Sequence, residues 1–207
     1  MNKVFASMVL AHLALVGCAS ATSATNRTEV APAARSARLA SHDFGSQRFD
    51  VHDFDFLNGE WDMVNRRLAH RGVGSQEWVE FPSVARHVQF LGGLFNVDEV
   101  IYPNGITGKN DGPYSGIAPR TFDVKTQRWS IYWISGKSGC CMTNPVEGGF
   151  VGDRGEFYGM DDDDGRPVKV RFVWTRLGPD KAHWDQSFDY GDGKWEMNWE
   201  NTLTRRR

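Results

Sequence analysis

The sequence lacks a surplus of charge of either sign. Among 207 residues, 24 Lys+Arg against 26 Asp+Glu leave a formal net charge of -2. This near balance argues against nucleic-acid binding, which needs a concentrated basic surface. Hydrophobic residues at 40% and charged residues at 24% are typical of a folded domain and exclude a disordered chain.

Long hydrophobic runs are missing, except for one at the start of the chain. Lys3 gives a basic beginning, and residues 4–16 form an apolar run that only Ser7 and His12 interrupt. A membrane-spanning helix needs roughly 20 apolar residues, so this run is too short to span. It has the length and charge of a secretory signal, which predicts residues 1–17 to be a signal peptide.

Leu15-Val16-Gly17-Cys18 resembles the lipobox of bacterial lipoproteins. The resemblance implies cleavage before Cys18 and attachment of lipid to that residue, so the bilayer becomes an expected partner. Ala19 in place of Asp resembles passengers sorted to the outer membrane of a Gram-negative bacterium, facing the periplasm. The alternative is an ordinary signal peptide followed by a chance cysteine.

Residues 18–52 are expected to form a flexible tether. Ala, Ser, Thr, Arg and Asn dominate there, and large apolar residues are nearly absent until Phe44 and Phe49. Such a segment cannot bury enough surface to offset the entropy of ordering. The sequence therefore predicts one folded domain, over residues 53–207.

That domain shows strand patterns and no convincing helical periodicity. Short runs rich in β-branched and aromatic residues alternate with turn clusters at a spacing of roughly 8–12 residues. They are 60–68, 76–81, 85–90, 95–101, 114–122, 128–135, 146–151, 155–158, 167–175, 183–188 and 194–204. We therefore expect an all-β fold, an antiparallel barrel or sandwich.

Alternation with period two identifies which residues share a face of a strand. Three such rows stand out in the sequence. They are Trp129, Ile131 and Trp133; Val168, Val170, Phe172 and Trp174; and Trp195, Met197 and Trp199.

A set of short motifs follows in order along residues 53–205. The first is Phe54-Asp55-Phe56-Leu57-Asn58-Gly59-Glu60-Trp61, in which Gly-x-Trp opens a strand. The others include 66–68, 93–99, 120–123, 129–133, 157–159, 165–172, 184–188 and 195–199. Together they resemble a bacterial family with a calycin-like (lipocalin-like) domain, which implies a single up-and-down barrel of about 8–11 strands and no established reaction.

Motifs that would identify an enzyme are absent from the sequence. It contains no Gly-x-Ser-x-Gly elbow, P-loop or dinucleotide fingerprint, and its histidines show no HExxH spacing. The run Asp161–Gly165 does not match a calcium loop. We therefore expect no metal site and no cofactor; a haem would have His87 or His183 as its candidate axial ligand. Catalysis stays open.

Cys140 and Cys141 are the only thiols besides Cys18. The pair has three alternative interpretations: incidental thiols in a loop, a vicinal disulfide, or redox or metal chemistry. No CxxC motif or nearby His supports a metal site.

The interior of the barrel is the expected binding site for a small, partly apolar ligand. Barrels of about eight strands can hold one small molecule, and aromatic pockets with a few polar groups are typical ligand sites. The candidate ligand-binding residues are Tyr132, Trp133, Arg171, Gln186, Asn198 and Trp199. The alternatives are an envelope protein-interaction module without a cavity, and a hydrolase or isomerase that uses the same cup. The sequence does not indicate an oligomeric state.

Overall fold

The computed structural model describes residues 42–207. Almost all regular structure there is antiparallel sheet, with two single-turn 3-10 helices, η1 (Asp55–Leu57) and η2 (Leu91–Gly93). The strands are β1 (Gly59–Leu68), β2 (Trp78–Phe90), β3 (Phe95–Tyr102), β4 (Tyr114–Asp123), β5 (Arg128–Ile131), β6 (Ile134–Ser135), β7 (Val146–Val151), β8 (Arg154–Asp163), β9 (Arg166–Gly178), β10 (Lys181–Asp189) and β11 (Glu196–Arg205).

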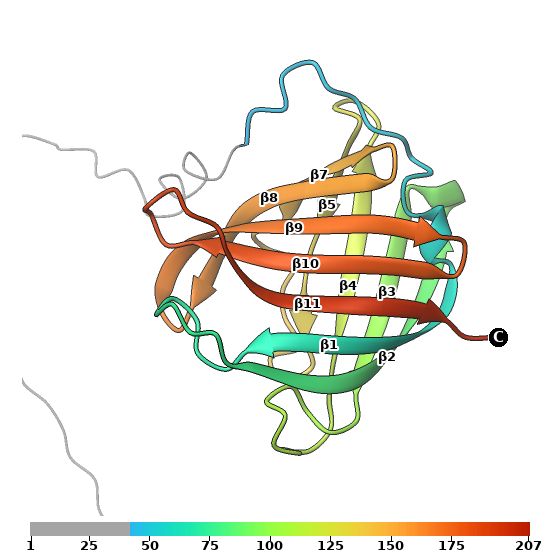
Figure 1. Cartoon of the computed structure of the whole chain (residues 1–207). Helices are drawn as coiled ribbons and strands as arrows, with labels where there is room; N and C mark the ends of the chain where they lie inside the picture. The colour runs from blue at the N-terminus through green and yellow to red at the C-terminus, as the bar shows by residue number, and fades with distance from the viewer. Residues whose placement is uncertain (1–41) are drawn as a thin grey trace, which may run out of the picture. The chain divides into compact units, whose positions relative to one another are not determined.

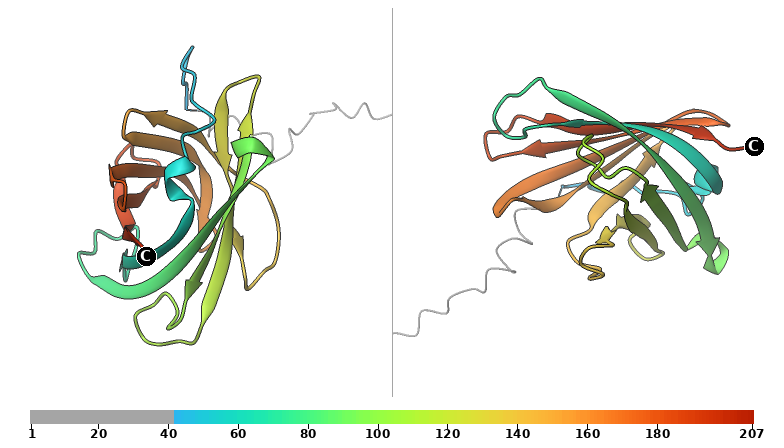
Figure 2. Two further views of the ribbon diagram at one scale, coloured as in Figure 1. Left: turned by 90° about the vertical axis from the view of Figure 1, so that its right-hand side faces the viewer. Right: turned by 90° about the horizontal axis from the view of Figure 1, so that it is seen from below.

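The strands close into one barrel in which sequence neighbours are also neighbours in space (Figure 1). β1 pairs with both β2 and β11, and β3 pairs with β4, so the ring has no open edge. β5 and β6 both pair with β4 and occupy one position, which gives a barrel of ten strands. Seen end-on, the ring is closed (Figure 2). The predicted all-β, up-and-down barrel is confirmed.

Two strand boundaries differ from those expected. β2 runs unbroken through Pro82, which pairs with Val64 of β1. β3 joins β2 only from Val84 onward, so the missing N–H of Pro82 costs no ladder bond on that side. The single strand expected over 128–135 is interrupted at residues 132–133 and becomes β5 and β6.

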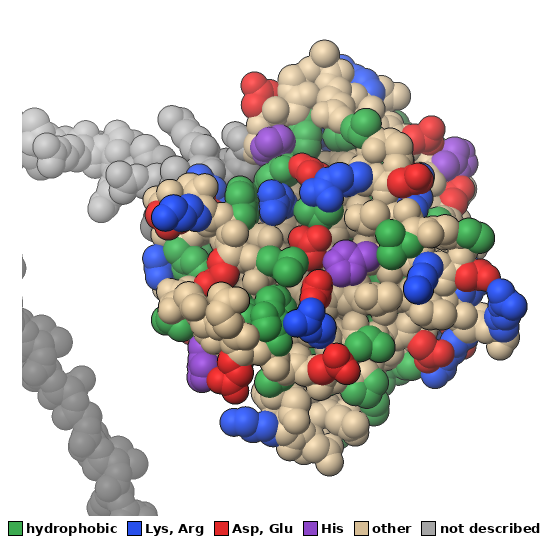
Figure 3. Space-filling model, viewed as in Figure 1, with side chains coloured by type: hydrophobic (Ala, Val, Ile, Leu, Met, Phe, Trp, Pro, Cys, Tyr) green, Lys and Arg blue, Asp and Glu red, His purple; other side chains and the backbone are tan. Residues whose placement is uncertain are grey.

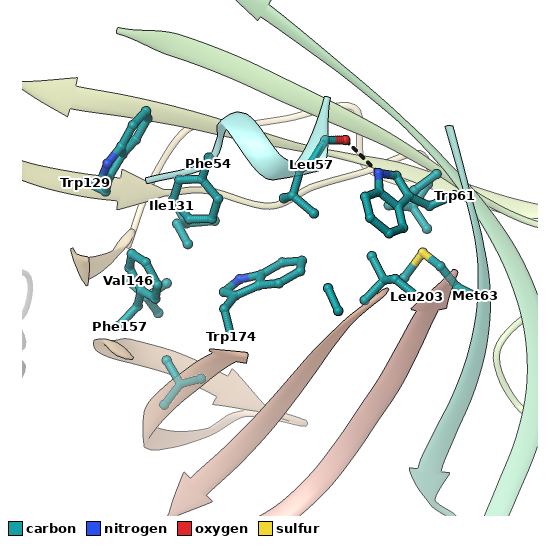
Figure 4. Packing of buried hydrophobic residues seen from close by; sticks show 14 of the residues in the cluster. Phe54, Leu57, Trp61, Met63, Trp129, Ile131, Val146, Phe157, Trp174 and Leu203 are labelled. Atoms are coloured by element: carbon teal, nitrogen blue, oxygen red, sulfur yellow. Dashed lines mark hydrogen bonds between the residues drawn. The ribbon is translucent and has the colours of Figure 1, made fainter. Parts of the chain in front are cut away.

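One end of the barrel is plugged by the chain that leads into β1, and we call it the closed end. Phe54 and Leu57 of this plug are fully buried, and the Leu57 carbonyl accepts a hydrogen bond from the Trp61 indole N–H at 2.6 Å (Figure 4). Phe54 makes an edge-to-face contact with Trp129 at 5.1 Å between centroids. The plug therefore anchors the closed end in the aromatic core.

Contacts with the barrel begin before residue 53. Phe49 is buried, and its amide donates to the Gln127 carbonyl at 3.0 Å. A Cβ on Gly149 of β7 would lie 2.1 Å from the Phe49 ring, so only glycine lets this ring approach the strand so closely. Part of the segment expected to be tether, residues 44–50, thus packs on the barrel.

The outer face over β8–β11 and β1 carries charges of both signs (Figure 3). Arg66 and Glu200 form an ion pair at 2.6 Å, and His183 lies 3.7 Å from Glu200. Such interspersed charges suit a solvated surface. Among residues 42–207, no helix is long and apolar enough to cross a membrane.

Candidate ligand-binding cavity

The barrel encloses a cavity of about 430 Å³. It extends from the closed end, where Asp98 and Arg120 form its floor, to the opposite end, which we call the mouth. At the mouth its wall includes the loop between β6 and β7 and the start of the β8–β9 turn. A cavity of this size is within the range of small-ligand sites.

Aromatic side chains make most of the cavity wall on the side of β9, β10 and β11. Phe172 and Trp184 meet edge to face with centroids 5.0 Å apart, and Trp184 and Trp199 do so at 6.2 Å. Trp174 lies closer to the floor. Its ring packs against Arg120, and the guanidinium carbon is 5.6 Å from the ring centroid. These rings offer flat apolar surface, whose burial stabilises a bound ligand by roughly 25 cal/mol per Å².

The floor is a buried polar network from three adjacent strands. Asp98 of β3 accepts one hydrogen bond from Arg120 of β4 and forms a second with Nδ1 of His87 of β2. Arg120 also donates to the Asn96 side-chain oxygen at 3.1 Å, and its guanidinium lies over the Phe54 ring at 4.7 Å. All four polar residues of the network are buried.

The ionised form of Asp98 is strongly favoured. Burial of this carboxyl opposes ionisation, but the neighbouring Arg120 guanidinium and the hydrogen bonds from His87 and Arg120 outweigh it, so the pKa of Asp98 lies well below its usual value. A carboxylate held in this way does not exchange protons near neutral pH. Asp98 is therefore suited to holding the Arg120 guanidinium in place at the cavity floor.

Side-chain amides form a second polar layer midway up the barrel. Asn65 accepts a hydrogen bond from the Trp199 indole N–H at 3.1 Å and donates to the Ser83 hydroxyl at 2.8 Å. Gln186 donates to the Asn198 side-chain oxygen at 2.9 Å. Asn201 lines the cavity, and its side-chain oxygen is buried with no hydrogen-bond partner.

The mouth combines apolar and acidic groups. Cys140 and Cys141 are joined by a disulfide, and both line the cavity. The Trp133 ring lies against Gly116, where a Cβ would be only 2.4 Å from it. Asp161 and Asp162 complete the rim beside Arg71. The arrangement of Cys140 and Cys141 corresponds to the vicinal disulfide among the alternatives that the sequence left for the two cysteines, and their redox state stays a prediction.

The structure brings together most of the residues proposed to bind the ligand. Tyr132, Trp133, Gln186 and Trp199 line the cavity, and Asn198 lies behind the wall, bonded to Gln186. Their role in binding stays a prediction.

Arg171 does not point inward as proposed. It alternates with Val170 and Phe172, which face the cavity, so its guanidinium lies on the outside of β9, 5.0 Å from the Trp195 ring. Arg120 is the arginine at the cavity floor.

The expected row of Trp195, Met197 and Trp199 is also corrected. Gln186 pairs with Trp199 and Ser187 with Met197, which leaves Asn198 as an extra residue in a β-bulge. The bulge reverses the alternation, so Trp199 lines the cavity while Met197 is exposed and Trp195 packs against Arg171 outside.

The two histidines considered as haem ligands lie elsewhere. His87 belongs to the buried floor network, bonded to Asp98, and does not line the cavity, while His183 is on the outer face beside Glu200. Within residues 42–207, no group of His, Cys, Asp or Glu side chains is arranged to hold a metal ion. Cys18 and the signal peptide lie outside the described residues.

Asp98, Arg120 and Asn201 were missed in the sequence. Arg120 and Asp98 appear there as ordinary charged positions 22 residues apart, and only the pairing of β3 with β4 joins them. Asn201 offered a weak signal, because it alternates with Trp199 and Leu203 on one strand.

Comparison with known proteins supports the fold. Rv2717c from M. tuberculosis is similar over 78% of this chain and 100% of its own, with 12% identity and a TM-score of 0.53. The S-type phycobiliprotein lyase CPES from Guillardia theta has 12% identity and a TM-score of 0.48 over 74% of this chain and 90% of its own. EF1p2_mFAP2b, solved bound to DFHBI, has 13% identity and a TM-score of 0.38 over 75% of this chain and 98% of its own.

The likeness to Rv2717c shows a common antiparallel barrel and is consistent with the calycin-like fold. The other two likenesses are too distant to support an argument about this chain. No family model matches the sequence, and no curated protein matches it either. Membership of the calycin-like bacterial family therefore stays a prediction.

Proposed function

We propose that this protein binds a small, partly apolar ligand inside the barrel. The observation that carries the proposal is the cavity of about 430 Å³, which has aromatic walls, a polar floor and a single layer of amides between them. This combination is typical of small-molecule sites, where apolar contact supplies affinity and a few polar groups fix orientation. A solid interaction module without a cavity does not account for it.

A neutral aromatic probe tests the proposal. N-phenyl-1-naphthylamine, whose fluorescence rises in apolar surroundings, is titrated into the purified protein. We expect saturable binding with one site per chain and a dissociation constant of about 1–10 μM, which corresponds to roughly 7–8 kcal/mol.

A pair of variants locates the probe. Ala118 lines the cavity and pairs directly with Asp98, so Ala118→Phe places a ring above the floor. Thr202 of β11 is exposed on the outer face, and Thr202→Phe adds the same ring there. We expect Ala118→Phe to weaken probe binding at least tenfold and Thr202→Phe to leave it unchanged. Equal binding by both folded variants would contradict a ligand site in the barrel.

We also propose that the chain is exported and anchored by lipid on Cys18, on the outer membrane and facing the periplasm. The support is the signal-like start, the lipobox-like Leu15-Val16-Gly17-Cys18 and Ala19 after it. In a Gram-negative host, the wild-type chain should fractionate with outer membranes and incorporate labelled palmitate. Cys18→Ala should abolish the palmitate label, and the variant should no longer fractionate with outer membranes as a processed protein. A wild-type chain that takes up no label would refute the lipid anchor.

A further inference from the structure

Asn201 carries an unused hydrogen-bonding group in the wall of the cavity. The residue is 6% exposed, and its side-chain oxygen is buried without a partner. The neighbouring amide oxygens differ: that of Asn65 accepts from Trp199, and that of Asn198 accepts from Gln186. A buried acceptor without a donor is costly. The Asn201 amide nitrogen is not among the buried unpaired atoms, so a 180° rotation of the amide would bring the oxygen to the cavity side, where a ligand can donate to it.

Two indole rings flank this amide. Asn201 pairs across the sheet with Trp184 and follows Trp199 by two positions on the same face of β11. The two rings are 6.2 Å apart between centroids and lie at 77° to each other, which forms an aromatic corner beside the amide. A planar ring can stack on one indole and meet the other edge to face.

The charges around the cavity do not favour an anion. Those that face it or lie against its wall are Arg67, Arg71, Arg120, Asp98, Asp161, Asp162 and Asp163. Arg120 is paired with Asp98, and Arg71 with Asp163. Within the part of the chain that the structure describes, Arg67, Asp161 and Asp162 take part in no ion pair, so the unpaired groups are one cation and two carboxylates. A carboxylate or phosphate would find no surplus of positive charge to offset its desolvation.

We propose that Asn201 determines ligand specificity, and that the ligand is a neutral ring compound whose N–H or O–H group donates to the Asn201 side-chain oxygen. This inference rests on the proposed function, because it specifies which ligands the same cavity accepts. In this arrangement the ring of the ligand packs in the aromatic corner, and the polar substituent of that ring hydrogen-bonds to the Asn201 amide.

Three naphthalenes of similar shape test the inference by displacement of N-phenyl-1-naphthylamine. They are 2-naphthol, which is neutral and has a donor; 2-methoxynaphthalene, which is neutral and lacks one; and 2-naphthoate, which is an anion. We expect 2-naphthol to bind about tenfold more tightly than 2-methoxynaphthalene, since the latter leaves the amide oxygen unsatisfied. The naphthoate should bind more weakly than 2-naphthol.

Asn201→Leu is the matched variant, because leucine has nearly the same shape and no polar atoms. It should bind 2-naphthol and 2-methoxynaphthalene with affinities within about twofold of each other, so the tenfold preference disappears. Asn201→Ala, which also lacks a side-chain acceptor, serves the same purpose if the leucine variant does not fold. The wild-type preference measured alone already tests the need for a donor.

The outcomes separate this inference from the proposed function. If N-phenyl-1-naphthylamine itself fails to bind, the proposed function is wrong. If the probe binds but 2-naphthol shows no preference, or the same preference persists in the folded Asn201 variants, the specificity role of Asn201 is wrong. Tightest binding by 2-naphthoate would overturn the choice of a neutral ligand.

Discussion

The guanidinium of Arg205, on the last strand, lies 4.3 Å from the ring centroid of Trp61, on the first strand. The same side chain donates to the carbonyl oxygens of Phe56 and Asn58, each at 2.6 Å. One residue at the end of the described chain thus holds the plug that closes the barrel at its beginning.

Arg205→Ala is expected to destabilise the protein by about 2–3 kcal/mol, because it removes a cation–π contact and leaves plug carbonyls without a donor. Urea unfolding followed by tryptophan fluorescence measures the loss. Arg206→Ala is the control, since Arg206 makes an exposed ion pair with Asp62 that is worth about 0–1 kcal/mol. Equal losses for the two variants would show that the plug does not depend on Arg205.

Removing one partner of the floor ion pair should cost more than removing both. Asp98→Asn leaves the buried Arg120 without its carboxylate, which we expect to destabilise by about 3–5 kcal/mol. The double variant Asp98→Leu/Arg120→Met removes both charges and should recover part of this loss. Unfolding free energies of Asp98→Leu, Arg120→Met and the double variant give the coupling between the two residues; strict additivity would contradict a paired floor.

The same pair predicts a pH dependence on the acid side. Because the pKa of Asp98 is lowered on folding, its contribution to stability is present above the unfolded value of about 4 and is lost as the pH falls below it. The stability difference between wild type and Asp98→Asn should therefore shrink between about pH 5 and pH 2. A difference that is constant over this range would refute the lowered pKa.

Three tyrosines should ionise late in the folded protein. Burial and the hydrogen bond to Glu156 raise the pKa of Tyr158 to about 12, and burial raises the pKa values of Tyr102 and Tyr190 as well. Because these pKa values exceed the unfolded value of about 10, their contribution to stability is complete below pH 10 and declines above it. Absorbance at 295 nm measures the ionisation. Tyr158→Phe should remove a late step, and loss of an early step instead would contradict the assignment.

The disulfide at the mouth predicts a redox effect on ligand exchange. The folded protein should show no reactive thiol at Cys140 or Cys141, and a phosphine reductant should expose both and add two hydrogens to the mass. Since both sulfurs belong to the cavity wall, reduction should release N-phenyl-1-naphthylamine faster. The Cys140→Ser/Cys141→Ser variant has no disulfide, so it should release the probe at the same rate with and without reductant. If the reductant leaves the wild-type release rate unchanged, the disulfide does not affect ligand exchange.

The sequence predicted the strands best where alternation is uninterrupted. Val168, Val170, Phe172 and Trp174 share one face of β9, as expected, because a fully paired strand keeps its side-chain period of two. The structure shows that this face is the inner one. The expected break between residues 81 and 85 is absent, because β2 runs through Pro82 at a position where β3 does not pair with it. A local pattern cannot show where that pairing begins.

The candidate site was less predictable, because the side of the sheet on which a residue lies depends on pairing. A single bulge places Trp199 inside and Met197 outside. Arg171 and Arg120 look alike in the sequence, and only the partner Asp98 on the adjacent strand explains why Arg120 is the buried one. The identity of the polar floor therefore follows from register rather than composition.

The pairing of β1 with β11 has a consequence for the order in which the chain is made. A ribosome synthesises Trp61 before most of the barrel and Arg205 after it, so ten of the eleven strands are made before the strand that closes the barrel. Until then, β1 has one unpaired edge and the plug lacks its guanidinium clamp. A nascent chain that stops before β11 would leave β1 and β10 with unpaired sheet edges and the aromatic interior open. Unpaired strand edges promote aggregation, so the barrel is protected only once β11 has been synthesised.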